Sequence, residues 1–261
     1  MSNHLIIETA SNGVASITMN RPKVGNAFNA ELISEMISAL KQLEGEETRL
    51  LQLRGSGKHF SAGGDLNWMK DSINLSEQDN YDDARTLSEL LYTLNNFPAP
   101  TMAVVQGAAF GGAVGLISAC DIAIGSETSR YSLSEVKIGL IPAVISAYVG
   151  QAIGTRQARR YFLTAEVFSG IKAFELELLH EVVPESELND KAQALTQQLL
   201  ENAPGASRLA KSMLHKVHNR PIDDAFVEMA CREIARVRVS PEGQEGLASF
   251  LEKRKPSWRQ P

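Results

Sequence analysis

Two glycine-rich stretches contain the residues whose types and spacing could do chemistry. They read "FSAGGDL" at 60–66 and "QGAAFGG" at 106–112, and each follows a predicted strand. Glycine at a strand-to-helix turn lets the backbone approach a ligand closely and leaves amide N–H groups free to donate. At a helix N-terminus such amides carry partial positive charge and bind anionic oxygen. Either loop alone would equally suit a tight turn, but the pair predicts a site for a negatively charged oxygen.

A single carboxylate, Glu135, adds a second kind of chemistry. It lies in the stretch "SLSEVKIGLIP", where Val136, Ile138 and Leu140 make the surroundings apolar. Desolvation of this kind raises the pKa of a carboxyl group and suits it to acid–base work. A glutamate at the end of a strand is more commonly a surface residue. It is the combination with the two glycine loops that makes Glu135 a candidate.

The sequence also argues against several classes of protein. It contains none of the patterns GxxxxGK[ST], GxGxxG and GxSxG, which disfavours a P-loop, a dinucleotide-binding site and a serine hydrolase. A net charge of −5 without a long basic run argues against nucleic acid as a partner. No apolar run approaches the ~18 residues of a membrane span, so no membrane partner is expected. No set of side chains shows convincing metal-ligand spacing, and no metal is expected.

The N-terminus and the cysteines bear on the compartment. The stretch "MSNHLIIETASNG" lacks the basic and apolar regions of a signal peptide. Cys120 and Cys231 are far apart and belong to no CxxC pair, which favours buried free thiols over a disulfide. A cytoplasmic protein is therefore expected.

Strands and helices must hold the candidate residues in place. Apolar runs at 5–8 and 14–19 flank Asn12-Gly13, which predicts a hairpin, and Asn29 is expected to cap a helix with an apolar stripe from Leu32 to Leu43. Strands are also predicted at 50–53, 102–105 and 121–124, with a helical pattern at 87–94 and a further strand and turn at 130–142. From residue 143 onward the chain reads as almost purely helical. Strands separated by helices predict an α/β fold.

Four segments, taken in the order in which they occur along the chain, resemble the crotonase superfamily, also called the enoyl-CoA hydratase/isomerase family. "MNRPKVGNAFN" resembles its first coenzyme A loop, and "HFSAGGDL" resembles a loop that carries one oxyanion-hole amide. "VQGAAFGGAVGLISACDIAIGSE" is similar to the loop and helix that carry the second amide, and "YSLSEVKIGLIP" to the segment with a catalytic glutamate. The resemblance implies a crotonase-like spiral of ββα units with a helical C-terminal region.

The resemblance also implies a set of site residues. The backbone amides of Ala62 and Gly112 would bind the thioester oxygen of an acyl-CoA, and Glu135 would exchange protons with the substrate. Coenzyme A is then part of the substrate, and no separate cofactor is expected. The residues expected to border the substrate are Lys23, Val24, Gly25, Ala27, Gly64, Asp65, Leu66, Gly111 and Gly115.

One departure from the family pattern affects the predicted reaction. Many enoyl-CoA hydratases carry a second catalytic glutamate at the position held here by Gly115. The stretch "GLISACDIAI" and the later "SLSEVKIGLIPAVISAYV" look most like bacterial hydratases of the methylglutaconyl-CoA type. A hydratase is therefore favoured over a Δ3,Δ2-enoyl-CoA isomerase that uses the same site. A non-catalytic protein of the same fold is the third alternative.

The resemblance finally predicts how the chain is organised and assembled. Residues 1–195 would form the ββα spiral core with the acyl-CoA site, and residues 196–261 would form a helical trimerisation region. The expected assembly is a homotrimer or a homohexamer made of two trimers. The identity of the acyl group is not readable from the residues.

Overall fold

A six-stranded sheet organises the protein, whose computed structural model describes residues 4–45, 47–217 and 220–259. The strand order is β1-β2-β3-β4-β6-β9. The first two strands pair antiparallel and every later neighbour pairs parallel. The strands are β1 (Leu5–Thr9), β2 (Val14–Met19), β3 (Leu50–Gly55), β4 (Thr101–Val105), β6 (Ile122–Ser126) and β9 (Glu181–Val183).

The sequence pattern of each strand explains its place in this sheet. Strand β2 alternates between partly and fully buried residues, as expected for a strand whose two faces differ in burial. Strand β4 is buried along its whole length, as parallel strands covered on both faces usually are. The predicted β1–β2 hairpin is confirmed, and its turn contains Gly13 at φ 85°, a backbone angle that favours glycine.

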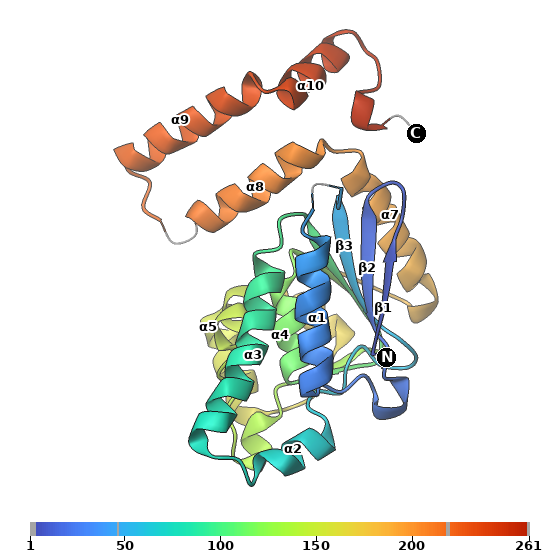
Figure 1. Ribbon diagram of the computed structural model, residues 1–261, viewed down its shortest axis with the longest axis vertical. Helices are drawn as coiled ribbons and strands as arrows, with labels where there is room; N and C mark the ends of the chain where they lie inside the picture. Colours follow the sequence, from blue (N-terminus) through green and yellow to red (C-terminus); the bar gives the residue numbers. More distant parts are fainter. Residues whose placement is uncertain (1–3, 46, 218–219, 260–261) are drawn as a thin grey trace.

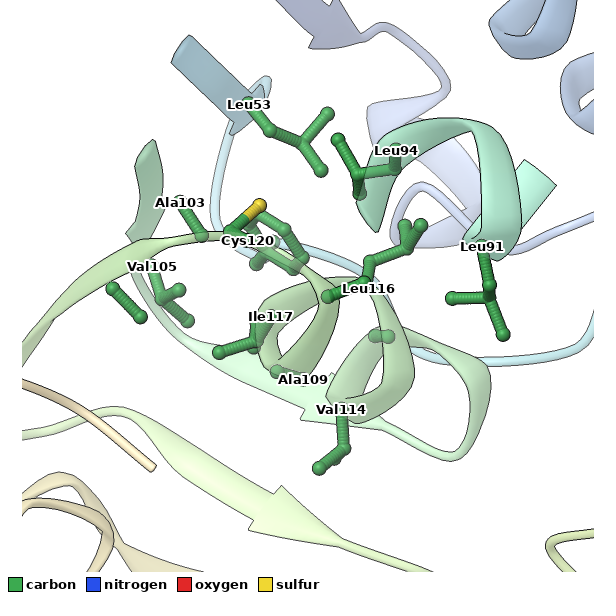
Figure 2. Packing of buried hydrophobic residues seen from close by; sticks show 14 of the residues in the cluster. Leu53, Leu91, Leu94, Ala103, Val105, Ala109, Val114, Leu116, Ile117 and Cys120 are labelled. Atoms are coloured by element: carbon green, nitrogen blue, oxygen red, sulfur yellow. The ribbon is translucent and has the colours of Figure 1, made fainter. Parts of the chain in front are cut away.

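Helices cover both faces of the sheet (Figure 1). On one side lie α1 (Ala30–Leu43), α3 (Glu77–Asn95) and α4 (Gly112–Ala119), and on the other lies α7 (Leu188–Leu200). The Asn29 side chain accepts a hydrogen bond from the Leu32 amide, so the predicted cap of α1 is confirmed. Figure 2 shows the core between these layers, where Leu116 and Ile117 of α4 lie between side chains of the strands and Leu91 and Leu94 of α3.

A second, smaller sheet lies next to the glycine loops. It contains β5 (Ala108–Phe110), β7 (Arg130–Ser132) and β8 (Phe168–Ser169). A bridge between Ser61 and Ala109 adds the first glycine loop to its edge. This sheet therefore aligns the residues before α4 with the residues before Glu135.

The C-terminal part is less purely helical than predicted. After residue 143 the helices are α5 (Ser146–Thr164), α6 (Gly170–Glu175), α7, α8 (Pro204–Val217), α9 (Asp224–Arg238) and α10 (Pro241–Leu251). Strands β8 and β9 interrupt them, and β9 completes the main sheet beside β6. The expectation of an almost purely helical region missed these two short strands, because pairing with β7 and with β6 decides their conformation.

The C-terminal helices extend away from the sheet. In Figure 1, α8 lies beside the core while α9 and α10 lie beyond it. The Lys211 Nζ of α8 donates to Asp121 Oδ2 at 2.7 Å, and Arg208 donates to the carbonyl oxygens of Gly45 and Thr48. Residue 195, where the sequence divides the predicted core from the predicted trimerisation region, lies within α7.

Several short elements connect the longer strands and helices. Helix α2 (Leu66–Ser72) follows the first glycine loop, and 3-10 turns occupy Pro22–Val24, Glu135–Ile138, Glu185–Glu187 and Ser257–Arg259. Both cysteines are free thiols, with Cys120 buried but Cys231 exposed. Among the described residues, no helix is both long and apolar enough to cross a membrane.

Candidate active site

The first glycine loop is held by residues far away in the sequence. The Ala62 amide donates to the Gly25 carbonyl oxygen at 2.8 Å. This hydrogen bond occupies the N–H that was predicted to be a free oxyanion-hole donor, so the prediction for Ala62 is corrected. Its acceptor comes from the 3-10 turn at residues 22–24 and the glycine that follows it, at φ 64°. Gly25 was predicted to border the substrate, and its carbonyl oxygen makes a structural contact with the first glycine loop.

Gly64 has a free amide in this loop. Within the described part of the chain no residue accepts a hydrogen bond from it. The flanking groups are fixed, because the Phe28 amide donates to Gly63 O at 2.7 Å and the Asp65 amide donates to Phe28 O at 2.8 Å. Gly63 has φ 96°, and a Cβ there would lie 3.1 Å from the Phe110 carbonyl oxygen. Glycine at 63 thus permits the turn that leaves the Gly64 N–H exposed.

The second glycine loop presents another free amide. Gly111 has φ 56°, and its own amide donates to Ser132 O at 2.9 Å. Gly112 is the first residue of α4, and its amide likewise has no acceptor among the described residues. The first amides of a helix have no partner inside the helix, and they carry the positive end of its dipole. The predicted donor at Gly112 is therefore available.

Phe28 brings the two free amides to one place. Its backbone forms a bridge with Gly64, and a Cβ on Gly112 would lie 3.3 Å from its ring. The two loops also run side by side, because the Phe110 amide donates to Ser61 O at 3.1 Å and the Ser61 amide donates to Ala108 O at 3.0 Å. Phe28 therefore contacts the residues that carry both free amides, which makes the two N–H groups candidates to bind one oxygen atom.

Glu135 lies next to Gly111 of the second glycine loop. It begins the 3-10 turn Glu135–Ile138, and its Oε1 would lie 3.1 Å from a Cβ on Gly111. Its Oε2 is buried and has no hydrogen-bond partner within the described ranges. Burial raises the pKa of Glu135 above its usual value. A carboxyl group with an unused buried oxygen and a raised pKa is suited to accept and return a proton.

The position of the absent second carboxylate is filled by another side chain. Gly115 is buried in α4, and a Cβ there would lie 2.8 Å from the Cβ of Ile145 and closer still to its Cγ2 methyl. Leu91 Cδ2 would be at 3.5 Å. Gly115 was predicted to border the substrate, but the space beside its Cα belongs to the packed interior.

Asp65 and Leu66 have contrasting surroundings. The Asp65 carboxylate caps α2 through the Asn67 amide at 2.9 Å and pairs with Arg21 at 2.8 Å. Burial alone would raise its pKa, but these hydrogen bonds outweigh burial and hold the pKa of Asp65 below its usual value. Both carboxylate oxygens of Asp65 therefore make contacts that fix the loop. Leu66 is 81% exposed at the start of α2, where an apolar ligand could contact it.

The rest of the predicted first coenzyme A loop is partly open. Lys23 and Val24 are exposed on the 3-10 turn, whereas Ala27 is buried. The Ala27 carbonyl oxygen accepts from Arg21 Nη1. Lys23 and Val24 can therefore meet a ligand, and Ala27 acts through its backbone.

Several residues of the site were not predicted as such. Phe28, Arg21 and Ile145 carry no chemistry that would single them out, and their roles depend on partners distant in sequence. His59, which precedes the first glycine loop, makes a structural contact with the second one. Its Nδ1 accepts from the Ala108 amide at 3.0 Å, and burial with the nearby Lys58 and Arg130 lowers its pKa. No group of three or more metal-ligating side chains occurs in the described ranges.

Comparisons with known proteins indicate the family of the chain. Residues 9–261 match the family described as "Enoyl-CoA hydratase/isomerase". The chain is similar to the crystal structure of an enoyl-CoA hydratase from Shewanella pealeana, with 45% identity, a TM-score of 0.94 and coverage of 98% and 96% of the two chains. It is also similar to Pseudomonas aeruginosa AtuE, with 33% identity, a TM-score of 0.95 and coverage of 98% and 100%. An "Enoyl-CoA isomerase/hydratase" of Mycosarcoma maydis is 32% identical over 94% of this chain and 92% of its own.

Proposed function

Because the chain belongs to the enoyl-CoA hydratase/isomerase family, whose fold it shares, we propose that it adds water to an α,β-unsaturated acyl-CoA. The observation that carries the proposal is the meeting of two free amides, on Gly64 and Gly112, with the unpartnered carboxyl oxygen of Glu135. The amides would bind the thioester oxygen, which becomes negative when water attacks the β-carbon. Two fixed donors aimed at a developing oxyanion act in this way in many acyl-transfer and enolate sites.

Proton movement in this reaction would depend on one group. The Glu135 carboxylate takes a proton from water, and the hydroxide oxygen forms a bond to the β-carbon. The electron pair of the double bond moves onto the thioester oxygen, giving an enolate held by the Gly64 and Gly112 amides. The protonated Glu135 then gives its proton to the α-carbon, which restores the carboxylate. A raised pKa suits both halves of this cycle, because the group must gain and lose a proton in turn.

The proposed substrate includes branched acyl-CoAs of the 3-methylglutaconyl type. Support comes from the resemblance of the segments around Gly115 and Glu135 to bacterial hydratases of that type. Exposed apolar side chains next to the site suit an acyl chain, since Leu66 is 81% and Ile141 72% exposed. We further propose that Lys23 and Val24 contact coenzyme A.

A Δ3,Δ2-enoyl-CoA isomerase is the second candidate, and one observation favours it. Ile145 fills the space beside Gly115, so this position supplies no second carboxylate to hold a water molecule. Glu135 could instead take a proton from the α-carbon of a 3-enoyl-CoA and return it to the γ-carbon. The same two amides would stabilise the enolate.

A panel of acyl-CoA thioesters tests the two reactions. Crotonyl-, 3-methylcrotonyl-, 3-methylglutaconyl- and 3-enoyl-CoA are incubated with the protein and followed by ultraviolet absorbance and mass spectrometry. A hydratase increases the mass of a conjugated substrate by one water and removes the ultraviolet absorbance of the conjugated enoyl thioester. An isomerase keeps the mass of a 3-enoyl-CoA and creates that absorbance. Turnover of none of the four contradicts the enzyme proposal. Glu135→Gln serves as the matched control, because a protein that only binds acyl-CoA would be indifferent to it.

We also propose that the chain acts in the cytoplasm as a homotrimer or a pair of trimers. Apolar side chains without cover in one chain support assembly, since Val239, Phe250 and Leu251 of the α9–α10 region are 76%, 81% and 77% exposed. Light scattering coupled to size exclusion distinguishes the trimer and the hexamer from a monomer.

A further inference from the structure

We propose that Ile145, seated against Gly115 of α4, is a positioning residue that sets the place of Glu135. This inference rests on the proposed function for its activity measurement, but its structural argument is independent of the acyl group. The segment from Glu135 to Ile145, the 135–145 segment, is held against α4.

Gly111, the N-cap of α4, and Gly115, inside α4 four residues further along, leave space for two side chains of the 135–145 segment. These two positions together are called the paired notch. A Cβ on Gly111 would lie 3.1 Å from Glu135 Oε1, and a Cβ on Gly115 would lie 2.8 Å from Ile145 Cβ. The space of both missing side chains is therefore occupied by the two ends of the 135–145 segment.

The segment is fixed at both ends and exposed between them. Near Glu135 it is tied by the Gly111 amide, which donates to Ser132 O at 2.9 Å. Residues 137–141 are exposed, with Ile138 and Leu140 at 57% and 56%. Ile145 is only 2% exposed, and the Val149 amide donates to its carbonyl oxygen, so its position also sets the start of α5. Pro142 is also buried, and Ile145 fixes the C-terminal end of the 135–145 segment.

Local hydrogen bonds brace the backbone between Glu135 and the start of α5. The Leu140 amide donates to Glu135 O at 3.0 Å, the Ala143 amide to Ile141 O at 2.8 Å, and the Ser146 amide to Ala143 O at 3.1 Å. A segment braced in this way moves as a unit more readily than it stretches. Displacing Ile145 should therefore shift Glu135 relative to the Gly112 amide.

The size of the displacement can be worked out for Gly115→Ala. Carbon atoms in contact prefer a separation of about 3.5–4.0 Å, so a Cβ placed 2.8 Å from Ile145 Cβ requires a shift of about 1 Å. A misplacement of about 1 Å in an active site can lower the rate by ~10²-fold. Alanine is otherwise the better helix former, so any loss at this position comes from the contact.

The test is a double-mutant cycle of Gly115→Ala and Ile145→Gly, followed with the best substrate of the acyl-CoA panel. Glycine is acceptable at an N-cap, which is the position of Ile145 in α5. Gly115→Ala should lower kcat about 10²-fold with little change in KM in the wild-type background. In the Ile145→Gly background it should cost no more than about threefold, because the opposing atoms are gone. Gly150→Ala is the matched control, since a Cβ there meets nothing within 4 Å, and it should leave kcat unchanged.

A second readout needs no substrate. Carboxyl ¹³C NMR of the labelled protein gives the pKa of Glu135, assigned by the resonance that Glu135→Gln removes. Burial raises this pKa in the native protein, so Gly115→Ala should lower it toward the ordinary glutamate value by moving the carboxyl group outward. A purely structural role for Ile145 would change stability and leave this pKa where it is.

Each outcome decides the inference. Gly115→Ala with native kcat and native Glu135 pKa overturns it, and so does an equal loss in both backgrounds. If the wild type turns over no acyl-CoA, the proposed function fails while the NMR titration still decides the role of Ile145. If Gly115→Ala does not fold, recovery of folding in the double variant supports the paired notch, and failure of the double variant to fold contradicts it.

Discussion

Replacing single backbone amides by esters separates the two candidate donors of the first glycine loop. Glycolic acid at position 64 removes the Gly64 N–H and lactic acid at position 62 removes the Ala62 N–H, while each side chain is kept. The Gly64 amide donates to no described residue, whereas the Ala62 amide donates to Gly25 O at 2.8 Å. The Gly64 substitution should therefore lower mainly the activity, and the Ala62 substitution should lower mainly the stability.

The magnitudes follow from these contacts. Loss of one oxyanion donor costs about 10²–10³-fold in kcat, or about 2.7–4 kcal/mol, so the Gly64 ester should lose that much activity. Loss of one ordinary hydrogen bond costs about 1 kcal/mol, so the Ala62 ester should be destabilised by that amount and remain active. Each ester also weakens one accepting carbonyl, since Gly63 O accepts from Phe28 and Ser61 O accepts from Phe110, which makes the two variants a matched pair.

The assay combines steady-state kinetics with urea unfolding of the same two proteins. An ester at Gly112, introduced in the same way, should match the Gly64 ester in both measurements. If the Ala62 ester loses activity while the Gly64 ester keeps it, the assignment of the free amide is refuted. Loss of activity in both would mean that the loop conformation, and not one N–H, controls the reaction.

Three further predictions concern the carboxylate and the attachment of α8. Glu135→Gln should abolish turnover while acyl-CoA binding, followed by calorimetry, remains; unchanged turnover would remove Glu135 from the mechanism. Burial raises the pKa of Glu135 in the folded protein, so ionisation of this side chain lowers the free energy of unfolding. Glu135→Gln should therefore be more stable than wild type at neutral pH. This advantage should disappear below about pH 4, where both side chains are neutral. Lys211→Met breaks the ion pair with Asp121, whose side chain is 28% exposed, and should lower the free energy of unfolding by about 3 kcal/mol. Lys172→Met, which breaks an exposed ion pair, should change the free energy of unfolding by less than about 1 kcal/mol.

The sequence sufficed for features set by nearby residues. The Asn29 cap, the hairpin at Gly13 and the apolar stripe of α1 are local patterns, and the structure contains all three. The order of the four motif segments was also enough to indicate the fold. These features need only the neighbours within a few residues or a resemblance along the whole chain.

Contacts between distant segments could not be predicted in the same way. The choice between the Ala62 and Gly64 amides depends on Gly25 O, an acceptor contributed by an earlier loop. The sequence shows that position 115 lacks a carboxylate. That Ile145 fills the space beside Gly115 depends on how the start of α5 packs against α4. Strand β9 is three residues long, and only its parallel partner β6 makes it a strand.

Strand β9 also has a consequence for how the protein is made. The main sheet lacks its last strand until Glu181–Val183 have left the ribosome, although β6 ends at Ser126. At synthesis rates of ~5–20 residues per second, the edge of β6 remains open for roughly 3–11 s. During that time its unpaired N–H and C=O groups can template pairing with another nascent chain. Slower translation of residues 127–180 should therefore increase aggregation, and expression with rare codons confined to that interval would measure the effect.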